Sequence, residues 1–300
     1  MLTGVDRAFR LVFNALAFLG FAIGGALLSW IVLPVIRVRT ADEKEAARRS
    51  RAVVGWTFRL FHDYMRICRL ILYDPRRVVW PTIQGPVVVV ANHPTLIDVT
   101  ALLASRPDMV CIVKGALFHS PAFSHLLRCC GHIVSERDDG LAGAAVIREA
   151  LANLAEGVSV LIFPEGTRSP EGGMHRWRRG AFEIAARAGC PVLPVYLSCL
   201  PPVLAKAAPW YRTPADPAVL LVEPQALVDP VEWGGSSAKM AAEIEERLRR
   251  RMLAVGAKGG PRRDEAAASA VRSFTGDIGG NGRSTASRAE YHHASFSDES

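Results

Sequence analysis

A histidine and an aspartate lie five positions apart in the segment NHPTLID at 92–98, which follows an apolar run that begins at Val87. If Thr95 caps the helix that follows, Asp98 falls in its first turn, and its carboxylate can turn back towards the imidazole. An imidazole group, which titrates near neutral pH, can take the proton from an attacking hydroxyl group while the carboxylate fixes its tautomer. We therefore predict that His93 is a general base and that Asp98 is its orienting partner.

The same spacing has a purely structural alternative. Thr95 and Asp98 match a weak variant of the capping box, which would only start a helix. His93 would then be a turn histidine whose hydrogen bonds are satisfied locally. Spacing alone leaves both interpretations open.

A second polar segment, FPEGTRS at 163–169, also follows an apolar run directly. Close to its glycine turn, Glu165 and Arg168 would form a compact polar cluster in which the guanidinium group holds phosphate oxygens and backbone amides assist. Lys114, at the end of the run MVCIVK, would add a second positive charge beside this cluster. The alternative is a surface ion pair between Glu165 and Arg168 in a turn.

Short β-branched runs alternate with helical stretches from Pro86 onward, which is typical of an α/β domain. The runs lie at 87–92, 109–114, 158–163, 191–198 and 218–223, and helices are predicted at 139–156, 181–188 and 236–253. Because the runs are continuously apolar, we expect a buried, mostly parallel central sheet of six or seven strands flanked by helices. Both polar segments then lie at the carboxyl ends of strands, where ligands bind in open α/β sheets.

The N-terminal part of the chain predicts a membrane-anchoring helical element. From Leu11 to Ile36 the only strongly polar residues are Asn14 and Ser29, and a helix of that length extends about 39 Å, enough to span a bilayer. Pro34 and several glycines leave open a kinked or hairpin-like element that enters one leaflet only. A buried core helix is the other alternative. Basic residues follow the run more densely than they precede it, which predicts a cytosolic main domain.

We divide the chain into four parts on these patterns. Residues 1–36 are the membrane-anchoring element, and residues 37–80 are a basic linker followed by an amphipathic interfacial helix at 53–73. An ordinary helix packed on the domain explains the 53–73 pattern equally well. Residues 81–254 are the catalytic domain, and residues 255–300 are predicted to be a disordered tail, because they carry few large apolar side chains.

The composition limits the partners without selecting one. Half of the 300 residues are hydrophobic, and the formal net charge is +7. A basic chain suits nucleic acid, an acidic membrane surface, a phosphorylated substrate or an acidic protein. The six cysteines show no zinc-binding spacing, which predicts no structural metal.

The two polar segments together resemble the glycerolipid acyltransferase family, whose best-known members acylate lysophosphatidic acid. That family carries an NHxxxxD block followed by an FPEGTR block, and both are present here without substitution. The resemblance covers roughly residues 85–200, and it includes KGAL at 114–117, GHIVSER at 131–137, Arg179-Gly180 and PVLPV at 191–195.

The resemblance implies a reaction and a set of site residues. His93 corresponds to the family's general base, Asp98 to its orienting partner, and Lys114 and Arg168 to its phosphate contacts. The acceptor-binding turn corresponds to Glu165, Gly166, Thr167 and Arg168. The implied reaction moves a fatty acyl group from acyl-CoA or acyl-carrier protein to the hydroxyl of lysophosphatidate (1-acylglycerol-3-phosphate), giving phosphatidate.

The same resemblance implies the setting of the reaction. No metal and no cofactor besides the donor substrate is expected. The expected partners are membrane phospholipids, the lysophospholipid acceptor and the donor, with no nucleic acid. The expected location is the cytoplasmic (inner) membrane, with the catalytic domain on the cytosolic side.

Departures from the family pattern leave the acceptor open. Ser135-Glu136 and Arg178-Arg179-Gly180 differ from the common residues at these positions, and the segment at 201–214 points to a subgroup with another acceptor. That acceptor would be another lysophospholipid, an amino-acid lipid or a specialised lipid. An alternative of another class is a non-catalytic membrane adaptor that binds anionic lipid, although binding alone needs no general base. A hydrolase is disfavoured because the chain has no G-x-S-x-G motif.

Overall fold

A single mixed sheet organises the protein, whose computed structural model describes residues 2–136, 143–206 and 208–257. The strands are β1 (Ile71–Leu72), β2 (Val88–Ala91), β3 (Met109–Lys114), β4 (Ile133–Ser135), β5 (Ser159–Ile162), β6 (Val192–Leu200) and β7 (Ala218–Pro224). These seven strands are ordered β1-β7-β6-β2-β5-β3-β4, and every neighbouring pair is parallel except β6 and β7. The predicted α/β class and the mostly parallel sheet are confirmed.

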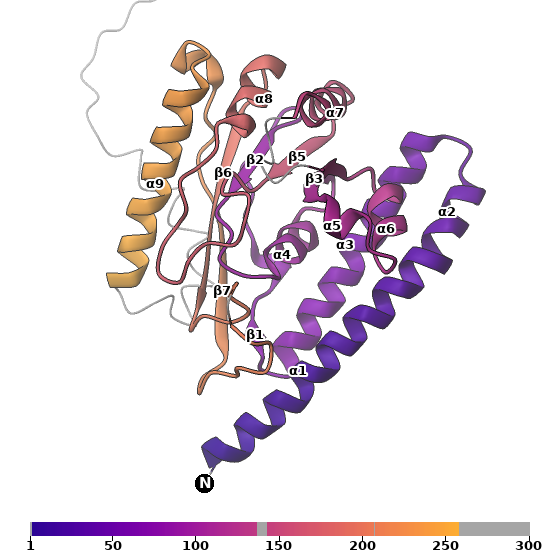
Figure 1. Cartoon of the computed structure of the whole chain (residues 1–300), viewed down its shortest axis with the longest axis vertical. Helices are drawn as coiled ribbons and strands as arrows, with labels where there is room; N and C mark the ends of the chain where they lie inside the picture. Colours follow the sequence, from indigo (N-terminus) through magenta and orange to yellow (C-terminus); the bar gives the residue numbers. More distant parts are fainter. Residues whose placement is uncertain (1, 137–142, 207, 258–300) are drawn as a thin grey trace, which may run out of the picture.

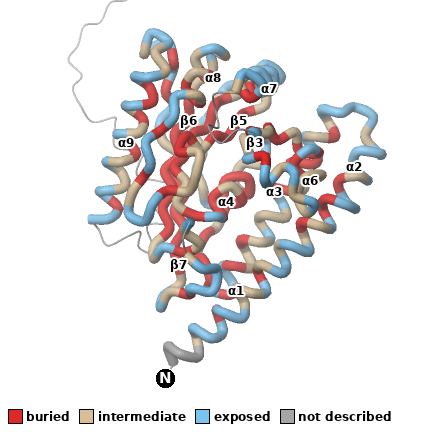
Figure 2. Tube along the Cα trace, viewed as in Figure 1, coloured by how far each residue is buried: buried red, intermediate tan, exposed pale blue. Residues whose placement is uncertain are grey.

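Helices cover both faces of the sheet (Figure 1). They include α4 (Asp98–Ser105), α7 (Ala144–Ala155), α8 (Gly180–Ala188) and α9 (Ser237–Ala257). Val88 and Val90 of β2 belong to the apolar cluster that contains residues of α7, α8 and α9, whereas Val89 and Ala91 belong to the cluster that contains α4. Successive strand residues point to opposite faces, so β2 is buried on both sides, as its unbroken apolar sequence predicts. Figure 2 shows the strands buried and the outer helix faces exposed.

The N-terminal residues form one long helical element. It consists of α1 (Leu2–Leu27), a π-helical turn (Leu28–Val32) and α2 (Leu33–Arg39). Pro34 does not end the element, and it lies just after the π-helical turn, which locally changes the hydrogen-bond pattern of the helix. The stretch from Asp6 to Arg39 is long and apolar enough to cross a membrane.

This element lies against the domain on one side only. The chain reverses after α2, and α3 (Glu43–Ile67) runs back beside it (Figure 1). Phe21 packs against Phe58, Phe61 and Phe123, and the Ser29 hydroxyl donates to the Ala122 carbonyl at 2.8 Å. The opposite side exposes large apolar side chains, so the element is neither a buried core helix nor free of the domain. These exposed side chains include Phe9, Val12, Leu16, Leu19, Ile23 and Leu27.

Short helices complete the domain beside the sheet. These are α5 (Gly115–Phe118) and α6 (Ser124–Cys129), with 3₁₀ turns at Pro75–Arg77 and Pro230–Trp233. The helix α6 packs with the π-helical turn and α3 in an apolar cluster that contains Leu28, Val54 and Leu126. The N-terminal element is thereby joined to the central sheet through α3 and α6.

Three predicted elements differ from the observed ones. The basic segment predicted as a linker is largely helical, because Asp42 accepts the N–H groups of Lys44 and Glu45 and so starts α3 early. The helix predicted at 53–73 ends at Ile67, and Ile71–Leu72 instead pairs with β7 at the edge of the sheet. The helix α9 continues to Ala257 because Val255 is buried in the core.

Two predictions extend beyond the described residues. The helix predicted from residue 139 is observed from Ala144, and residues 137–142 lie outside the described chain. The tail predicted from residue 255 is helical as far as residue 257. Its remaining residues, 258–300, also lie outside the described part.

Candidate active site

The two polar segments leave the sheet side by side. Strands β2 and β5 are parallel neighbours, with Val88 opposite Val160 and Val90 opposite Ile162. The segment NHPTLID starts directly after the last residue of β2, and FPEGTRS starts directly after the last residue of β5. Their shared position at the carboxyl edge of the sheet is the one predicted for them.

His93 and Asp98 form a hydrogen-bonded pair. The Nδ1 atom of His93 lies 2.8 Å from Oδ2 of Asp98, the first residue of α4, and the Asp98 side chain is fully buried. The imidazole stacks on Phe163, with ring centroids 4.3 Å apart. Because Nδ1–H donates to the carboxylate, Nε2 is left as the basic nitrogen. No hydrogen bond from another described residue occupies it, and the side chain is 17% exposed.

The Asp98 carboxylate also holds the turn that precedes it. It accepts the Thr95 N–H at 2.7 Å and the Thr95 hydroxyl at 2.5 Å. The prediction that Thr95 caps the helix is wrong, because α4 begins at Asp98 after Ile97, and the Thr95 hydroxyl donates to the carboxylate instead of accepting a backbone N–H. One carboxylate thus orients the histidine and fixes the turn, so the two sequence interpretations describe the same group.

Glu165 points into the protein and ties the two segments together. Its Oε1 accepts the His93 N–H at 3.0 Å and the Ser169 hydroxyl at 2.6 Å, and its Oε2 accepts the His175 N–H at 2.7 Å. The Ser169 N–H in turn donates to the His93 carbonyl at 2.7 Å. A buried carboxylate needs such donors to offset its lost hydration.

The expected pairing of Glu165 with Arg168 is therefore wrong, both as a polar cluster and as a surface ion pair. Arg168 instead donates from Nη1 to the Leu204 carbonyl at 2.9 Å. That carbonyl also accepts the Leu96 N–H at 3.3 Å. The remaining guanidinium nitrogens of Arg168, which is half-buried, have no hydrogen-bond partner within residues 2–136, 143–206 and 208–257.

Gly166 forms the tight turn between these side chains. Its φ of +68° lies in the left-handed region, and its N–H donates to the Phe163 carbonyl at 3.0 Å. A Cβ atom at this position would lie 3.4 Å from the guanidinium carbon of Arg178. Thr167, the next residue, is half-buried at the same turn.

Lys114 lies at the same edge of the sheet but does not join the pair. It ends β3, the other neighbour of β5, and it is exposed. Among the described residues, no hydrogen bond or ion pair links Lys114 to Arg168 or to His93. Its predicted phosphate contact and the substrate-binding roles of Glu165, Gly166 and Thr167 stay predictions.

Sequence reasoning missed two residues that build the site. The Asn92 side chain donates to the Leu197 carbonyl and accepts the Leu197 N–H, both at 2.7 Å, and so continues the pairing of β2 with β6. Ser169 bridges Glu165 and His93 as described above. Asn92 precedes His93 and Ser169 follows Arg168, but Leu197 and His93, which they bond, lie 105 and 76 positions away in the sequence.

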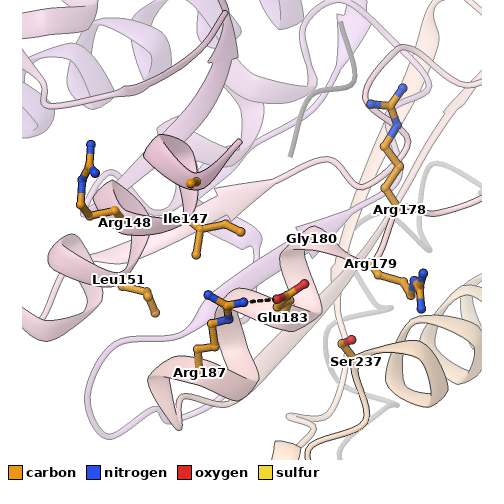
Figure 3. A pocket seen from close by; sticks show the side chains of 10 residues that line it. Ile147, Arg148, Leu151, Arg178, Arg179, Gly180, Glu183, Arg187 and Ser237 are labelled. Carbon is orange, nitrogen blue, oxygen red and sulfur yellow. Dashed lines mark hydrogen bonds and ion pairs between the residues drawn. The ribbon is translucent and has the colours of Figure 1, made fainter. Parts of the chain in front are cut away.

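A hollow of about 930 Å³ lies between α7 and α8 (Figure 3). It is lined by Ala144, Ile147, Arg148, Leu151, Arg178, Arg179, Gly180, Glu183, Arg187 and Ser237. Arg187 is paired with Glu183. The hollow meets the site at Arg178, whose N–H donates to the Pro164 carbonyl at 3.0 Å. In the described chain, no group of three His, Cys, Asp or Glu side chains is placed to hold a metal.

Known proteins share both the sequence and the fold. Residues 60–198 match the protein family described as Acyltransferase. A 1-acyl-sn-glycerol-3-phosphate acyltransferase of Chlamydomonas reinhardtii is 36% identical over 117 residues, which are 39% of this chain and 35% of that protein. The Escherichia coli enzyme of the same name is 33% identical over 116 residues, 38% of this chain and 47% of that protein. The match thus spans about a third of the length of the first curated relatives.

A solved structure agrees with the fold over most of the chain. The 1-acyl-sn-glycerophosphate acyltransferase PlsC of Thermotoga maritima superimposes with a TM-score of 0.62 at 21% identity, covering 85% of this chain and 98% of that one. This similarity concerns the fold alone. Residues 60–198 thus form an acyltransferase-family domain, which contains both polar segments.

Proposed function

We propose that the protein is an O-acyltransferase that moves a fatty acyl group from a thioester donor to the hydroxyl of lysophosphatidate, giving phosphatidate. One observation carries this proposal: the His93–Asp98 pair leaves Nε2 open, and Arg168, whose neighbour Ser169 bonds the His93 carbonyl, has guanidinium donors without a partner among the described residues. The names of the related proteins support 1-acyl-sn-glycerol-3-phosphate as the acceptor.

The arrangement supports direct transfer without a covalent enzyme intermediate. Nε2 of His93 removes the proton from the acceptor hydroxyl as the oxygen attacks the acyl carbon, and the Asp98 carboxylate stabilises the imidazolium that forms. The tetrahedral intermediate collapses to the ester, and the thiolate leaves with the proton returned by His93. Arg168 holds the acceptor phosphate through its free donors. This sequence of steps needs no metal or redox cofactor.

The donor is proposed to be acyl-CoA or acyl-carrier protein. Both offer the thioester that the mechanism requires, since a thiolate leaves without a metal to assist it. The basic character of the chain, with a net charge of +7, suits either donor, because both are anionic.

We also propose that the N-terminal element seats the domain on the cytosolic side of the inner membrane. Its contacts with the domain extend from Arg10 to Trp30, which is about 30 Å of helix. A perpendicular crossing would draw the docked domain surface into the lipid. This favours a helix that lies along the membrane with its exposed apolar side in one leaflet.

Acyl transfer by detergent-solubilised protein tests the proposal. Wild type and His93→Ala are offered lysophosphatidate and a panel of other lysolipids, with acyl-CoA or acyl-carrier protein as donor. His119→Ala is the matched control, since His119 is exposed, pairs with Glu136 and, among the described residues, has no hydrogen bond to either polar segment. Transfer to lysophosphatidate by wild type and by the control, but not by His93→Ala, supports the proposal.

Other outcomes select the alternatives. Transfer to a different lysolipid alone would change the acceptor and keep the catalytic assignment. Absence of transfer to any acceptor, with lipid binding unaffected by His93→Ala, would favour the non-catalytic adaptor.

A further inference from the structure

A long connection joins β6 to β7, two antiparallel neighbours that a short hairpin could link. It runs from Pro201 to Pro217, with residue 207 outside the described chain, and we call it the 201–217 loop. Connections of this length without regular structure are uncommon in compact domains and are usually functional. Its contacts lie on α1 at one end and on the catalytic segments at the other.

One stripe of α1 binds the loop. Arg10 donates from Nη2 to the Ala215 carbonyl at 2.5 Å, and Asn14 donates to the Trp210 carbonyl at 2.6 Å. Phe18 packs edge-on against the Trp210 ring at 5.7 Å between centroids. Residues four apart lie on one face of a helix, so these three side chains form a single docking line.

The docking line accounts for two polar residues of α1, Arg10 and Asn14, in the apolar part of that helix. Arg10 is 1% exposed, and besides the loop carbonyl it has Asp6 as an ion-pair partner at 3.0 Å. A buried guanidinium group is costly without such partners. The sequence of α1 is thus adapted to hold this loop as well as to contact lipid.

The tip of the loop exposes aromatic side chains. Trp210 is 46% exposed and Tyr211 is 59% exposed, and their rings pack edge to face at 5.8 Å. Arg212 and Lys206 are exposed close to them in the sequence. Tryptophan, tyrosine and flanking basic residues are the side chains that favour the interface of an anionic membrane.

The exposed apolar side of α1 adjoins this tip. Leu11 is 39% exposed, and Leu11, Ala15 and Phe18 occupy neighbouring positions on one helix face. Since Phe18 contacts Trp210, the apolar surface continues from α1 onto the loop. A membrane in contact with the exposed apolar side of α1 would therefore also contact Trp210 and Tyr211.

The other end of the loop reaches the catalytic segments through Leu204. This residue has a φ of +52°, which leucine rarely adopts, and its carbonyl accepts both Arg168 Nη1 and the Leu96 N–H. Leu96 is 50% exposed, so it places an apolar side chain on the surface next to Leu204. The loop therefore connects the N-terminal helix to the residue proposed to bind the acceptor phosphate.

We propose that the 201–217 loop is a second lipid-binding element, which inserts Trp210 and Tyr211 into the interface of an anionic phospholipid membrane and holds Arg168 in position through the Leu204 carbonyl. The lipid contact stands independently of the catalytic assignment. The positioning of Arg168 rests on the proposed function. An acceptor lipid would pass from the bilayer to Arg168 along the loop, beside the exposed apolar side chain of Leu96.

Fluorescence quenching tests the lipid contact without any turnover. The protein used is full-length His93→Ala with Trp30→Phe and Trp56→Phe, which leaves Trp210 as the most exposed of the remaining tryptophans. Vesicles of phosphatidylglycerol and phosphatidylcholine carry bromine on their acyl chains. We expect marked quenching that largely disappears when Trp210→Phe is added. Equal quenching with and without Trp210 would overturn the proposal.

Kinetics test the role of the loop in acceptor binding. Trp210→Ala with Tyr211→Ala should raise KM for lysophosphatidate in vesicles several-fold and change kcat little. Leu253→Ala is the matched control, because Leu253 is 68% exposed on α9, on the other side of the sheet (Figure 1). An unchanged KM in the double variant, with wild type active, would overturn the role of the loop in acceptor binding.

A single substitution in α1 separates docking from lipid affinity. Asn14→Leu makes the helix more apolar, so vesicle binding should be equal or stronger, yet it removes the hydrogen bond to the Trp210 carbonyl. We expect KM for the acceptor to rise all the same. A fall in KM in parallel with tighter vesicle binding would contradict the proposed link. If wild type transfers no acyl group, the quenching result still decides the lipid contact.

Discussion

Nδ1 of His93 and Oδ2 of Asp98 lie 2.8 Å apart, and the same Asp98 oxygen accepts the Thr95 N–H. The backbone of the turn therefore fixes the carboxylate, and the fixed carboxylate orients the imidazole. The position of the His93 imidazole is set by the turn as well as by the strand that precedes it. A substitution can therefore remove the charge of the Asp98 side chain and still keep its hydrogen bond to the Thr95 N–H.

Asp98→Asn should lower kcat by about 100- to 10,000-fold, because the amide no longer stabilises an imidazolium and can favour the wrong tautomer of His93. The measurement is steady-state acyl transfer with lysophosphatidate. Adding His93→Ala to Asp98→Asn should cost little more than His93→Ala alone, since both changes remove one function. Additive losses in the double variant would show that Asp98 acts independently of His93.

Glu165→Gln should destabilise the protein by about 1–3 kcal/mol, because the amide nitrogen would face a donor that Glu165 now satisfies. Thermal unfolding in detergent measures this loss. Glu171→Gln, an exposed glutamate after the same segment, is the matched control and should leave the melting temperature unchanged. An unchanged melting temperature in Glu165→Gln would mean that the buried contacts of this carboxylate contribute little.

Gly55→Ala should destabilise the protein although alanine favours helix by about 1 kcal/mol. A Cβ at this position of α3 would lie 2.4 Å from Cβ of Pro107 and 3.0 Å from the Leu103 carbonyl oxygen, neither of which can move freely. We expect a net loss of about 1–3 kcal/mol in thermal unfolding. Gly20→Ala in α1, where nothing lies within 4 Å, should be neutral or stabilising.

Two buried histidines should make stability fall in mild acid. Burial lowers the pKa of His62 to about 3 and that of His132 to about 4, from an ordinary value of 6.5. Between these values the unfolded chain binds protons that the folded chain does not, so stability rises with pH and is lost as the pH falls below 6.5. The slope is about 1.4 kcal/mol per pH unit for each histidine.

Melting temperatures between pH 7 and pH 5 measure this slope. His132 Nδ1 accepts the Cys111 N–H at 2.9 Å, an acceptor role that asparagine can retain without titrating. His132→Asn should therefore flatten the slope. A slope as steep as that of wild type would assign the acid sensitivity to other groups.

The local patterns of the sequence predict most of the fold and the position of the site. Continuous apolar runs such as 87–92 mark strands buried on both faces, and the polar segments follow them at the carboxyl edge. The fixed spacing of His93 and Asp98 predicts their contact because one turn and the first helical residue suffice to bring them together. These features depend on residues close together in the sequence.

The features that sequence reasoning missed depend on distant partners. Glu165 turns inward because His93 and His175 offer N–H groups, and the local sequence pattern does not predict these contacts. Arg168 binds a carbonyl 36 positions further along the chain, and Arg10 binds one 205 positions away. Local periodicity carries no information on such pairs, since they exist only after the sheet has assembled.

The side chain of Asn92 acts as a surrogate peptide group. By bonding both the N–H and the carbonyl of Leu197, it supplies β6 with one more rung than the main chain of β2 provides. The main chain is thereby released from the ladder one residue early, and the N–H and carbonyl of His93 become available to Glu165 and Ser169. The proposed base at the end of the strand thus has its own backbone anchors because the side chain of its neighbour, Asn92, makes the hydrogen bonds to β6.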